Sequence, residues 1–366
     1  MMTRLIGCTR LSRITIVIVM FALISSILFT INLYHKRDVG LFRENHNFVS
    51  RDQCPCVSGS RIDPIQAVYN DTNLAYNSLD KSQRLTIVKP CGSRYGKAVL
   101  GDDITVVYNR VPKCGSRMLI HCVRSLKNHI HGPLSMIPQK YKDELPLLTR
   151  SVDGVKSRKR AFLEGHVRFN NFQDENVYFF NMVRDPLDRL VSSFYFNRHG
   201  DGLLSPKQLE ELRKNTHPEV IDETFDECVH HERLSCTGPK MLGYMMGFFC
   251  GYHPMCRKPT QWTLEEAKRN LDYYTVVGIV EQYNSSMRAL EFLFPSMFSG
   301  LVKKYYSHQG TDYQAKSHAY RYVPPSPEVR KLMKEKMRLE YEFYEYAKLR
   351  FDMLLDELHL KDSDVR

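Results

Sequence analysis

The chain has 366 residues, enough to bury one large hydrophobic core or two smaller ones. Hydrophobic residues make up 43% of it and charged residues 25%, which is ordinary for a globular protein and excludes a low-complexity chain. The 52 Lys and Arg residues exceed the 41 Asp and Glu residues, giving a formal net charge of +11. Such a basic surface favours a polyanionic partner, which could be nucleic acid, acidic lipid or sulfated glycan.

The first apolar segment, residues 14–33, has no charged residue and is long enough to cross a bilayer as a helix. It has no clear Ala-x-Ala pattern, so we expect an uncleaved signal-anchor after a cytoplasmic tail at 1–13; a cleaved signal peptide is the alternative. Two glycosylation sequons, at Asn70 and Asn284, and nine of the ten cysteines lie beyond it, as expected of a luminal or secreted protein. That location argues against nucleic acid and favours a sulfated glycan.

Residues 34–100 are polar and rich in turn-forming residues, which predicts a stem between the membrane and a folded domain at 101–358; residues 359–366 would be a C-terminal tail. Strands and helices alternate in this domain. Continuous apolar runs predict buried strands at 104–109, 176–183 and 274–280. Helical periodicity and capping signals predict helices at 116–130, 186–198, 263–271 and 327–358.

Capping signals mark two of these helices. Thr263 followed by Glu266 is a capping box, and Ser326 followed by Pro327 is an N-cap with proline at the first helical position. Buried strands that alternate with helices are typical of an α/β fold. We therefore expect a parallel sheet with helices on both faces.

The loop after the first strand, residues 110–117, reads Arg-Val-Pro-Lys-Cys-Gly-Ser-Arg and leads directly into a helix. A helix N-terminus binds anions because it offers free N–H groups and a partial positive charge. Gly115 would let the backbone approach the anion, while Ser116 and Lys113 can donate hydrogen bonds to it. The Walker A pattern GxxxxGK[ST] is absent and no carboxylate stands ready for Mg²⁺, which argues against a nucleotide kinase. A basic surface turn is the alternative for this loop alone.

A second basic position, Arg184, closes the second predicted strand, and Ser192 follows two helical turns later. These two side chains can converge on one phosphate; the alternative is that Arg184 pairs with Asp185 or Asp188. Two anion sites at the carboxyl ends of strands in one parallel sheet fit a nucleotide with two separated phosphates.

Both loops resemble the phosphosulfate-binding and 3′-phosphate-binding motifs of sulfotransferases, PKxGS at 112–116 and RDPxxRxxS at 184–192. Further segments are similar to the glycosaminoglycan uronyl 2-O-sulfotransferases: YNRVPK, GH at 165–166, YFNRHGD, FDECV, FFCG and FYEYA. The versions PKCGSR and FFCGYHPMCRKP look closer to the uronyl (dermatan/chondroitin) branch than to the heparan branch. The resemblance covers roughly residues 102–352.

This resemblance implies the PAPS-dependent sulfotransferase (P-loop-like) fold, with 3′-phosphoadenylyl sulfate (PAPS) as the donor and no metal. It also implies a single-pass type II protein of the Golgi membrane with a luminal catalytic domain. By analogy with the trimers of the heparan branch, it suggests a homo-oligomer. The implied donor-binding residues are Lys113, Cys114, Gly115, Ser116, Arg117, Arg184 and Ser192.

The implied reaction is transfer of a sulfuryl group to the 2-hydroxyl of a uronic acid, iduronate or glucuronate, in a glycosaminoglycan such as dermatan or chondroitin sulfate. Two alternatives stay open: 2-O-sulfation of heparan sulfate, and a non-catalytic Golgi glycan-binding protein on the same scaffold. The reaction needs a cation at the leaving group, for which Lys113 is the candidate, and a base, for which His166 is the candidate. The heparan branch carries His-Gly-His here, whereas this chain has Glu164 in place of the first histidine, so Glu164 stays open as an alternative base.

Three further cations, Arg110, Arg198 and Lys316, are candidates for contacts with acidic sugars or with the donor. Arg110 lies in the same loop as Lys113, and Lys316 lies in a polar loop that could close over the site as a lid. For each of them, a solvated surface cation is the alternative.

Four cysteines lie in two close pairs with histidines nearby, so a zinc site is conceivable. The oxidising compartment and the family resemblance both favour disulfides instead, Cys228–Cys236 and Cys250–Cys256. We expect Cys114 and Cys122 to be free thiols. The pairing of the remaining luminal cysteines stays open; these are Cys54, Cys56 and Cys91.

Overall fold

The computed structural model describes residues 92–126, 135–137, 141–155, 158–214, 217–308 and 311–361. The expected tail and anchor, and with them Asn70 and Cys54, Cys56 and Cys91, lie outside the described residues. Among the described residues, no helix is both long enough and apolar enough to cross a membrane.

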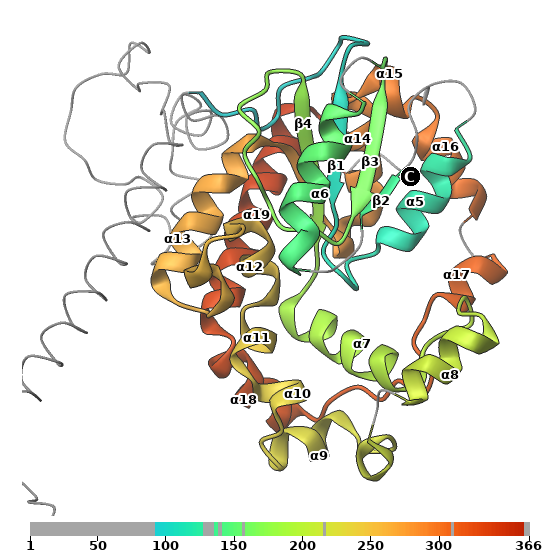
Figure 1. Ribbon diagram of the computed structural model, residues 1–366, viewed down its shortest axis with the longest axis vertical. Helices are drawn as coiled ribbons and strands as arrows, with labels where there is room; N and C mark the ends of the chain where they lie inside the picture. The colour runs from blue at the N-terminus through green and yellow to red at the C-terminus, as the bar shows by residue number, and fades with distance from the viewer. Residues whose placement is uncertain are drawn as a thin grey trace, which may run out of the picture. The chain divides into compact units, whose positions relative to one another are not determined.

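Five strands of the described chain form one parallel sheet in the order β2-β3-β1-β4-β5 (Figure 1). Their bounds are β1 Thr105–Asn109, β2 Ser135–Ile137, β3 Ala161–Gly165, β4 Val177–Val183 and β5 Tyr274–Ile279. The three predicted strands are confirmed as β1, β4 and β5. Every residue of β1, β3 and β5 is buried, so both faces of the sheet are covered.

The described helices surround this sheet and extend beyond its carboxyl edge (Figure 1). They are α5 Ser116–Arg124, α6 Tyr141–Asp153, α7 Pro186–His199, α8 Pro206–Lys214, α9 Phe225–His230, α10 Leu234–Thr237, α11 Pro239–Leu242, α12 Tyr244–Cys250, α13 Gln261–Asn270, α14 Tyr283–Leu293, α15 Pro295–Phe298, α16 Leu301–His308, α17 Asp312–Lys316, α18 Pro327–Lys336 and α19 Arg338–Glu357. The predicted helix starts at Ser116, Pro186 and Pro327 are confirmed.

Two helix predictions need correction. Helix α13 begins after Thr260, whose hydroxyl accepts the Thr263 N–H, so Thr260 and not Thr263 is the N-cap. The buried Thr263 hydroxyl instead donates to backbone carbonyls of the preceding turn. The single helix predicted from 327 to 358 is interrupted at Met337, because α18 and α19 bury their apolar faces in different cores.

The second of these cores lies apart from the sheet. Helices α7, α9, α10 and α18 build it from residues such as Leu190, Phe194, Phe225 and Met333. Figure 1 shows α7 beneath the carboxyl ends of the strands, with α9 and α10 farther away. Helix α7 therefore separates the sheet edge from the second core.

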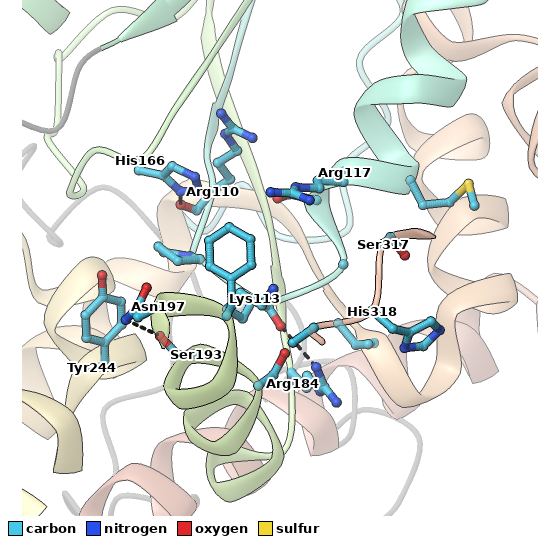
Figure 2. A pocket seen from close by; sticks show the side chains of 18 of the residues that line it. Arg110, Lys113, Arg117, His166, Arg184, Ser193, Asn197, Tyr244, Ser317 and His318 are labelled. Carbon is cyan, nitrogen blue, oxygen red and sulfur yellow. Dashed lines mark hydrogen bonds between the residues drawn. The ribbon is translucent and has the colours of Figure 1, made fainter. Parts of the chain in front are cut away.

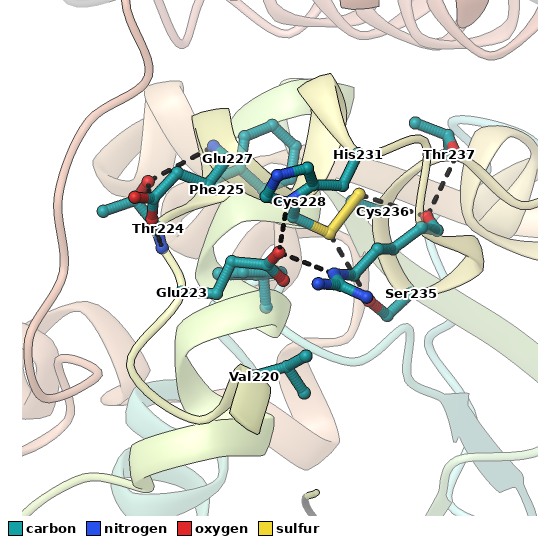
Figure 3. Close-up of a disulfide and its surroundings, with 12 residues drawn as sticks. Val220, Glu223, Thr224, Phe225, Glu227, Cys228, His231, Ser235, Cys236 and Thr237 are labelled. Carbon is teal, nitrogen blue, oxygen red and sulfur yellow. Dashed lines mark hydrogen bonds and ion pairs between the residues drawn. A yellow bond between two sulfur atoms is a disulfide. The ribbon is translucent and has the colours of Figure 1, made fainter. Parts of the chain in front are cut away.

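Both predicted disulfides are confirmed, Cys228–Cys236 and Cys250–Cys256, and Cys114 and Cys122 are buried free thiols. The first disulfide joins α9 to α10 at the second core (Figure 3). Beside it, Glu223 accepts hydrogen bonds from Arg233 Nε and pairs with His231. This short helical segment is thus held by a covalent bond as well as by ion pairs.

Replacing Cys228 and Cys236 together by Ser should lower the free energy of unfolding by about 2–3 kcal/mol, because the open chain gains the entropy of an eight-residue loop. Urea unfolding followed by circular dichroism measures the change. The Cys250–Cys256 disulfide stays intact in this variant, so the measured change reports the loss of the Cys228–Cys236 disulfide alone. An unchanged free energy of unfolding would mean that the α9–α10 link contributes nothing to stability.

Candidate functional site

A cavity of about 910 Å³ lies between the carboxyl edge of the sheet and α7 (Figure 2). Five cationic side chains line it, and no Asp or Glu of the described chain does. Figure 2 shows His166 and Arg110 on one side, His318 on the other and Lys113 between them. The cationic lining residues are Arg110, Lys113, Arg117, Arg184 and Lys240. Such an arrangement favours an anionic ligand.

The loop from β1 into α5 has the geometry of an anion site. Lys113 (φ 68°) and Gly115 (φ 69°) both have left-handed backbone conformations, so the chain turns sharply into the helix. A Cβ at Gly115 would lie 2.7 Å from the Tyr283 ring, so this position requires glycine. Ser116, the first residue of α5, borders the cavity. The free N–H groups of the first helical turn therefore lie beside the cavity.

Lys113 lies in the cavity with its ammonium 4.0 Å from the centre of the Phe196 ring. Burial, followed by the nearby charges of Arg117 and Arg184, lowers the pKa of Lys113 to about 8, although Asp201 opposes this shift. A bound anion would reverse it, because negative charge stabilises the ammonium form. Lys113, the predicted leaving-group cation, is thus placed where an anionic ligand would stabilise its charge.

Arg184 and Ser192 line the same cavity, and Arg184 Nη1 donates to the Lys113 carbonyl over 3.4 Å. The alternative pairing of Arg184 with neighbouring carboxylates is absent from the described contacts. Asp185 caps α7 by accepting the Asp188 N–H, and Asp188 pairs with Arg330. The structure therefore brings the two predicted anion loops together at one cavity.

His166 follows β3 and lines the cavity, with Nδ1 3.0 Å from the Arg110 carbonyl oxygen. A carbonyl can only accept, so in the neutral ring Nδ1 carries the hydrogen and Nε2 has the free lone pair. Burial, followed by the charge of Arg110, lowers the pKa of His166 to about 4; the carbonyl contact opposes this shift and Arg117 adds to it. The imidazole is therefore neutral near pH 7, as a general base must be.

Glu164 does not reach the cavity. It is fully buried at the end of β3, where Oε2 lies 2.7 Å from Arg110 Nε and Oε1 lies 3.5 Å from Arg124 Nη2. Both oxygens face guanidinium groups, so neither is available to a substrate. The alternative in which Glu164 is the base is not supported.

Other predicted residues divide into those at the cavity and those away from it. Arg110 and Arg117 line it, and Arg117 forms an ion pair with the buried Asp201. The Cys114 side chain instead points into the core, with Sγ 4.0 Å from Met245 Sδ, so only its backbone can take part in binding. Burial raises the pKa of the Cys114 thiol to about 12, which makes it unreactive at neutral pH.

Arg198 lies outside the cavity, and its predicted substrate contact is not supported. Its guanidinium carbon lies 3.5 Å from the centre of the Phe194 ring, its Nη2 lies 3.7 Å from Glu223, and its Nε donates to the Val220 carbonyl. Arg198 sits six residues after Ser192 on α7, about 120° around the helix from it, and therefore faces a different side. It joins α7 to the segment that precedes α9.

Lys316 is exposed at the end of α17, pairs with Asp312, and does not line the cavity. Its neighbours do line it, as expected of a covering loop; these are Gln314, Ser317, His318, Ala319 and Tyr322. The segment is tied to the end of α7 by the Gly202 N–H, which donates to the Lys316 carbonyl over 3.0 Å. The loop is therefore at the predicted place, but the Lys316 side chain is not.

The sequon residue Asn284 is half-buried near the start of α14, where its Oδ1 accepts a hydrogen bond from the Tyr306 hydroxyl. Ser286 of the same sequon is buried and bonded to the Ile279 backbone. Glycosylation at Asn284 stays a prediction.

Sequence reasoning missed several lining residues, among them Phe196, Lys240, Tyr244 and Tyr283. One signal could have found Phe196, because it lies four residues after Ser192 and therefore on the same face of α7. Nothing in the sequence distinguishes Lys240 from a solvated lysine. Its position depends on the tertiary placement of α11 at the cavity.

Titration of the imidazole signals by NMR should show His166 staying neutral down to about pH 4 in the folded protein. In urea all imidazoles should titrate near about 6.5, which provides the control. Any activity that needs the neutral ring should be lost as pH falls through the folded value. A His166 signal that titrates near 6.5 in the folded protein would contradict its burial beside Arg110.

Comparisons with known proteins identify a family and several relatives of this chain. A sequence model described as the sulfotransferase family matches residues 97–347. Mouse uronyl 2-sulfotransferase is 32% identical over 273 residues, which cover 70% of this chain but only 64% of that protein. Heparan sulfate 2-O-sulfotransferase 1 of Gallus gallus is 31% identical over 271 residues, covering 69% of this chain and 72% of that protein.

One solved structure, mouse sulfotransferase SULT7A1 complexed with PAP, is 14% identical with a TM-score of 0.35, covering 71% of this chain and 94% of that chain. A likeness at this level carries no argument about ligand or mechanism. The family match rests on the sequence model, which spans more than half of the 366 residues. The resemblance seen in the two anion loops is thereby confirmed, and the chain belongs to the sulfotransferase family.

Proposed function

We propose that this sulfotransferase moves a sulfuryl group from PAPS to the 2-hydroxyl of a uronic acid in a glycosaminoglycan such as dermatan or chondroitin sulfate. One observation carries the proposal: a single cavity joins both predicted anion loops to a neutral histidine. The 32% identity to a protein named uronyl 2-sulfotransferase supports the substrate class.

The donor fits the cationic half of the cavity. Lys113, Gly115 and Ser116 would hold its phosphosulfate beside the N-terminus of α5, and Arg184 with Ser192 would hold its 3′-phosphate. When bound, PAPS supplies the sulfuryl group. Lys113 can stabilise charge on the departing phosphate, and a position over the Phe196 ring keeps its ammonium directed into the cavity.

The acceptor side would use His166 Nε2 to take the proton from the sugar hydroxyl. Arg110 and Arg117 line the cavity, but each also pairs with a buried carboxylate. Lys240 also lines the cavity and forms no ion pair with the described residues, which makes it the stronger candidate to meet an acidic sugar. Lys240 is thus a proposed substrate-binding residue that the sequence analysis did not single out.

Two alternatives remain as second candidates. Heparan sulfate is favoured by the 31% identity to a heparan sulfate 2-O-sulfotransferase, which is close to that of the uronyl relative. A non-catalytic glycan-binding protein would not need Lys113 and His166 together at one cavity. We also propose the Golgi membrane as the location, with a single-pass type II anchor at 14–33, and a homo-oligomer by family analogy.

Incubation with labelled PAPS and a panel of glycosaminoglycans, followed by disaccharide analysis, tests this function. We expect label on the 2-position of uronic acid in dermatan or chondroitin sulfate. His166→Ala should lower turnover by about 10²–10⁴-fold with little change in nucleotide affinity, because the base faces the acceptor. Label on heparan sulfate alone would select the first alternative. Nucleotide and glycan binding without transfer would select the second.

Arg184→Ala should weaken binding of PAP, the desulfated product of PAPS, by about 1.5–3 kcal/mol, or roughly 10- to 150-fold. The cause is loss of a charge-assisted contact with the 3′-phosphate. Calorimetry measures the affinity. Arg330→Ala is the matched control, because Arg330 pairs with Asp188 near α7 but does not line the cavity. Equal affinities of the Arg184→Ala and wild-type proteins would remove Arg184 from the site.

A further inference from the structure

Three residues at the ends of β1 and β3 form a continuous chain of contacts. Glu164 pairs with the Arg110 side chain over 2.7 Å, and the Arg110 carbonyl oxygen lies 3.0 Å from His166 Nδ1. The parallel register explains their proximity, because Asn109 lies opposite Gly165 and so Arg110 and His166 leave the sheet side by side. Arg110 thus joins the buried carboxylate to the imidazole.

Glu164 is buried between two guanidinium groups. None of its surface is exposed, so its charge depends on the guanidinium groups of Arg110 and Arg124. Arg110 is itself only 6% exposed, and if its side chain turned away, Glu164 would keep only the longer, 3.5 Å contact with Arg124. Arg110 is therefore in contact with Glu164 through its side chain and with His166 through its backbone carbonyl.

The Arg110 carbonyl decides how His166 can act. While it accepts the Nδ1–H, the ring keeps the tautomer with a free lone pair on Nε2. Besides Arg110, the charged group that acts on this ring is Arg117, a cation that cannot accept a hydrogen bond from it. Loss of the carbonyl contact would leave the ring free to rotate or change tautomer.

We propose that Glu164 is a positioning residue for the sulfuryl transfer: by anchoring Arg110, it holds the carbonyl that orients His166 with Nε2 available to the acceptor hydroxyl. This inference rests on the proposed function for its catalytic consequence. Its structural part, the effect of Glu164 on the His166 tautomer, can be tested without any substrate.

The test compares Glu164→Gln with Glu164→Asp. Gln keeps the size of the side chain but removes its charge, whereas Asp keeps the charge on a side chain one methylene shorter. If Glu164 acts by anchoring Arg110, Asp should retain more activity than Gln, and Gln should lower kcat by about 10- to 100-fold with the KM for PAPS unchanged. If only packing matters, the order of the two variants should reverse.

Nitrogen NMR of the imidazole provides the readout that does not depend on activity. In the wild-type protein His166 should show one tautomer with hydrogen on Nδ1, and Glu164→Gln should mix the two tautomers. Glu164→Gln should also move the His166 titration to lower pH, because the charge of Arg110 is no longer balanced. Asp272→Asn is the matched control, since it removes a carboxylate from another Arg pair, 2.6 Å from Arg350, outside the cavity.

A Glu164→Gln protein with wild-type kcat and an unchanged His166 tautomer would overturn the inference. The inference would also fail if Asp272→Asn changed the His166 signals as much, because the effect would then be general destabilisation. If Glu164→Gln fails to fold, the tautomer and kcat of Glu164→Asp decide the question. Wild-type protein that transfers no sulfuryl group, while its His166 tautomer still depends on Glu164, would refute the proposed function and leave the positioning role standing.

Discussion

The parallel pairing of β1 with both β3 and β4 is the constraint on which the site depends. It makes three strands end at the same edge, so the loop at 110–115, His166 and Arg184 emerge beside one another although they are far apart in the sequence. An antiparallel neighbour would send one of these segments to the opposite edge. Helix α7, which follows β4, then borders the cavity and supplies Ser192 from its second turn.

Concentrating positive charge at one edge creates repulsion that the fold must offset. Buried carboxylates behind the cavity balance two of the cations, Glu164 for Arg110 and Asp201 for Arg117, while Lys113 lies against an aromatic ring. The cavity itself has no carboxylate among the described residues, so it keeps an attraction for anions. The same surplus of positive charge helps to keep His166 neutral. Burial is the larger cause of the neutral imidazole, and the cations that favour an anionic ligand add to it.

The sequence predicted the features that depend on local pattern. Strands β1, β4 and β5 are continuous apolar runs, and the anion loops follow two of them directly. Strand β3 was missed because it is short and ends in Glu164 and Gly165, which interrupt an apolar run. The interruption is explained only in three dimensions, where Arg110 and Arg124 meet the carboxylate.

The roles of the cations outside the two anion loops could not be predicted from the local sequence pattern. Nothing in the local sequence separates Arg198 from Lys240, yet Arg198 joins α7 to the segment before α9, whereas Lys240 lines the cavity. The difference arises from which face of a helix meets which neighbour. Helical geometry places Arg198 about 120° around α7 from Ser192 and so argues against a shared face, whereas the position of Lys240 depends on tertiary packing alone.

A crystal structure of the protein with PAP would show whether one nucleotide joins the two anion loops. We predict the 3′-phosphate at Arg184 and Ser192, and the 5′-phosphate between Lys113 and the N-terminus of α5. We also predict His166 Nε2 facing the space beyond the 5′-phosphate, with Nδ1 still on the Arg110 carbonyl. A nucleotide bound outside this cavity, or bound with its two phosphates exchanged, would contradict these assignments.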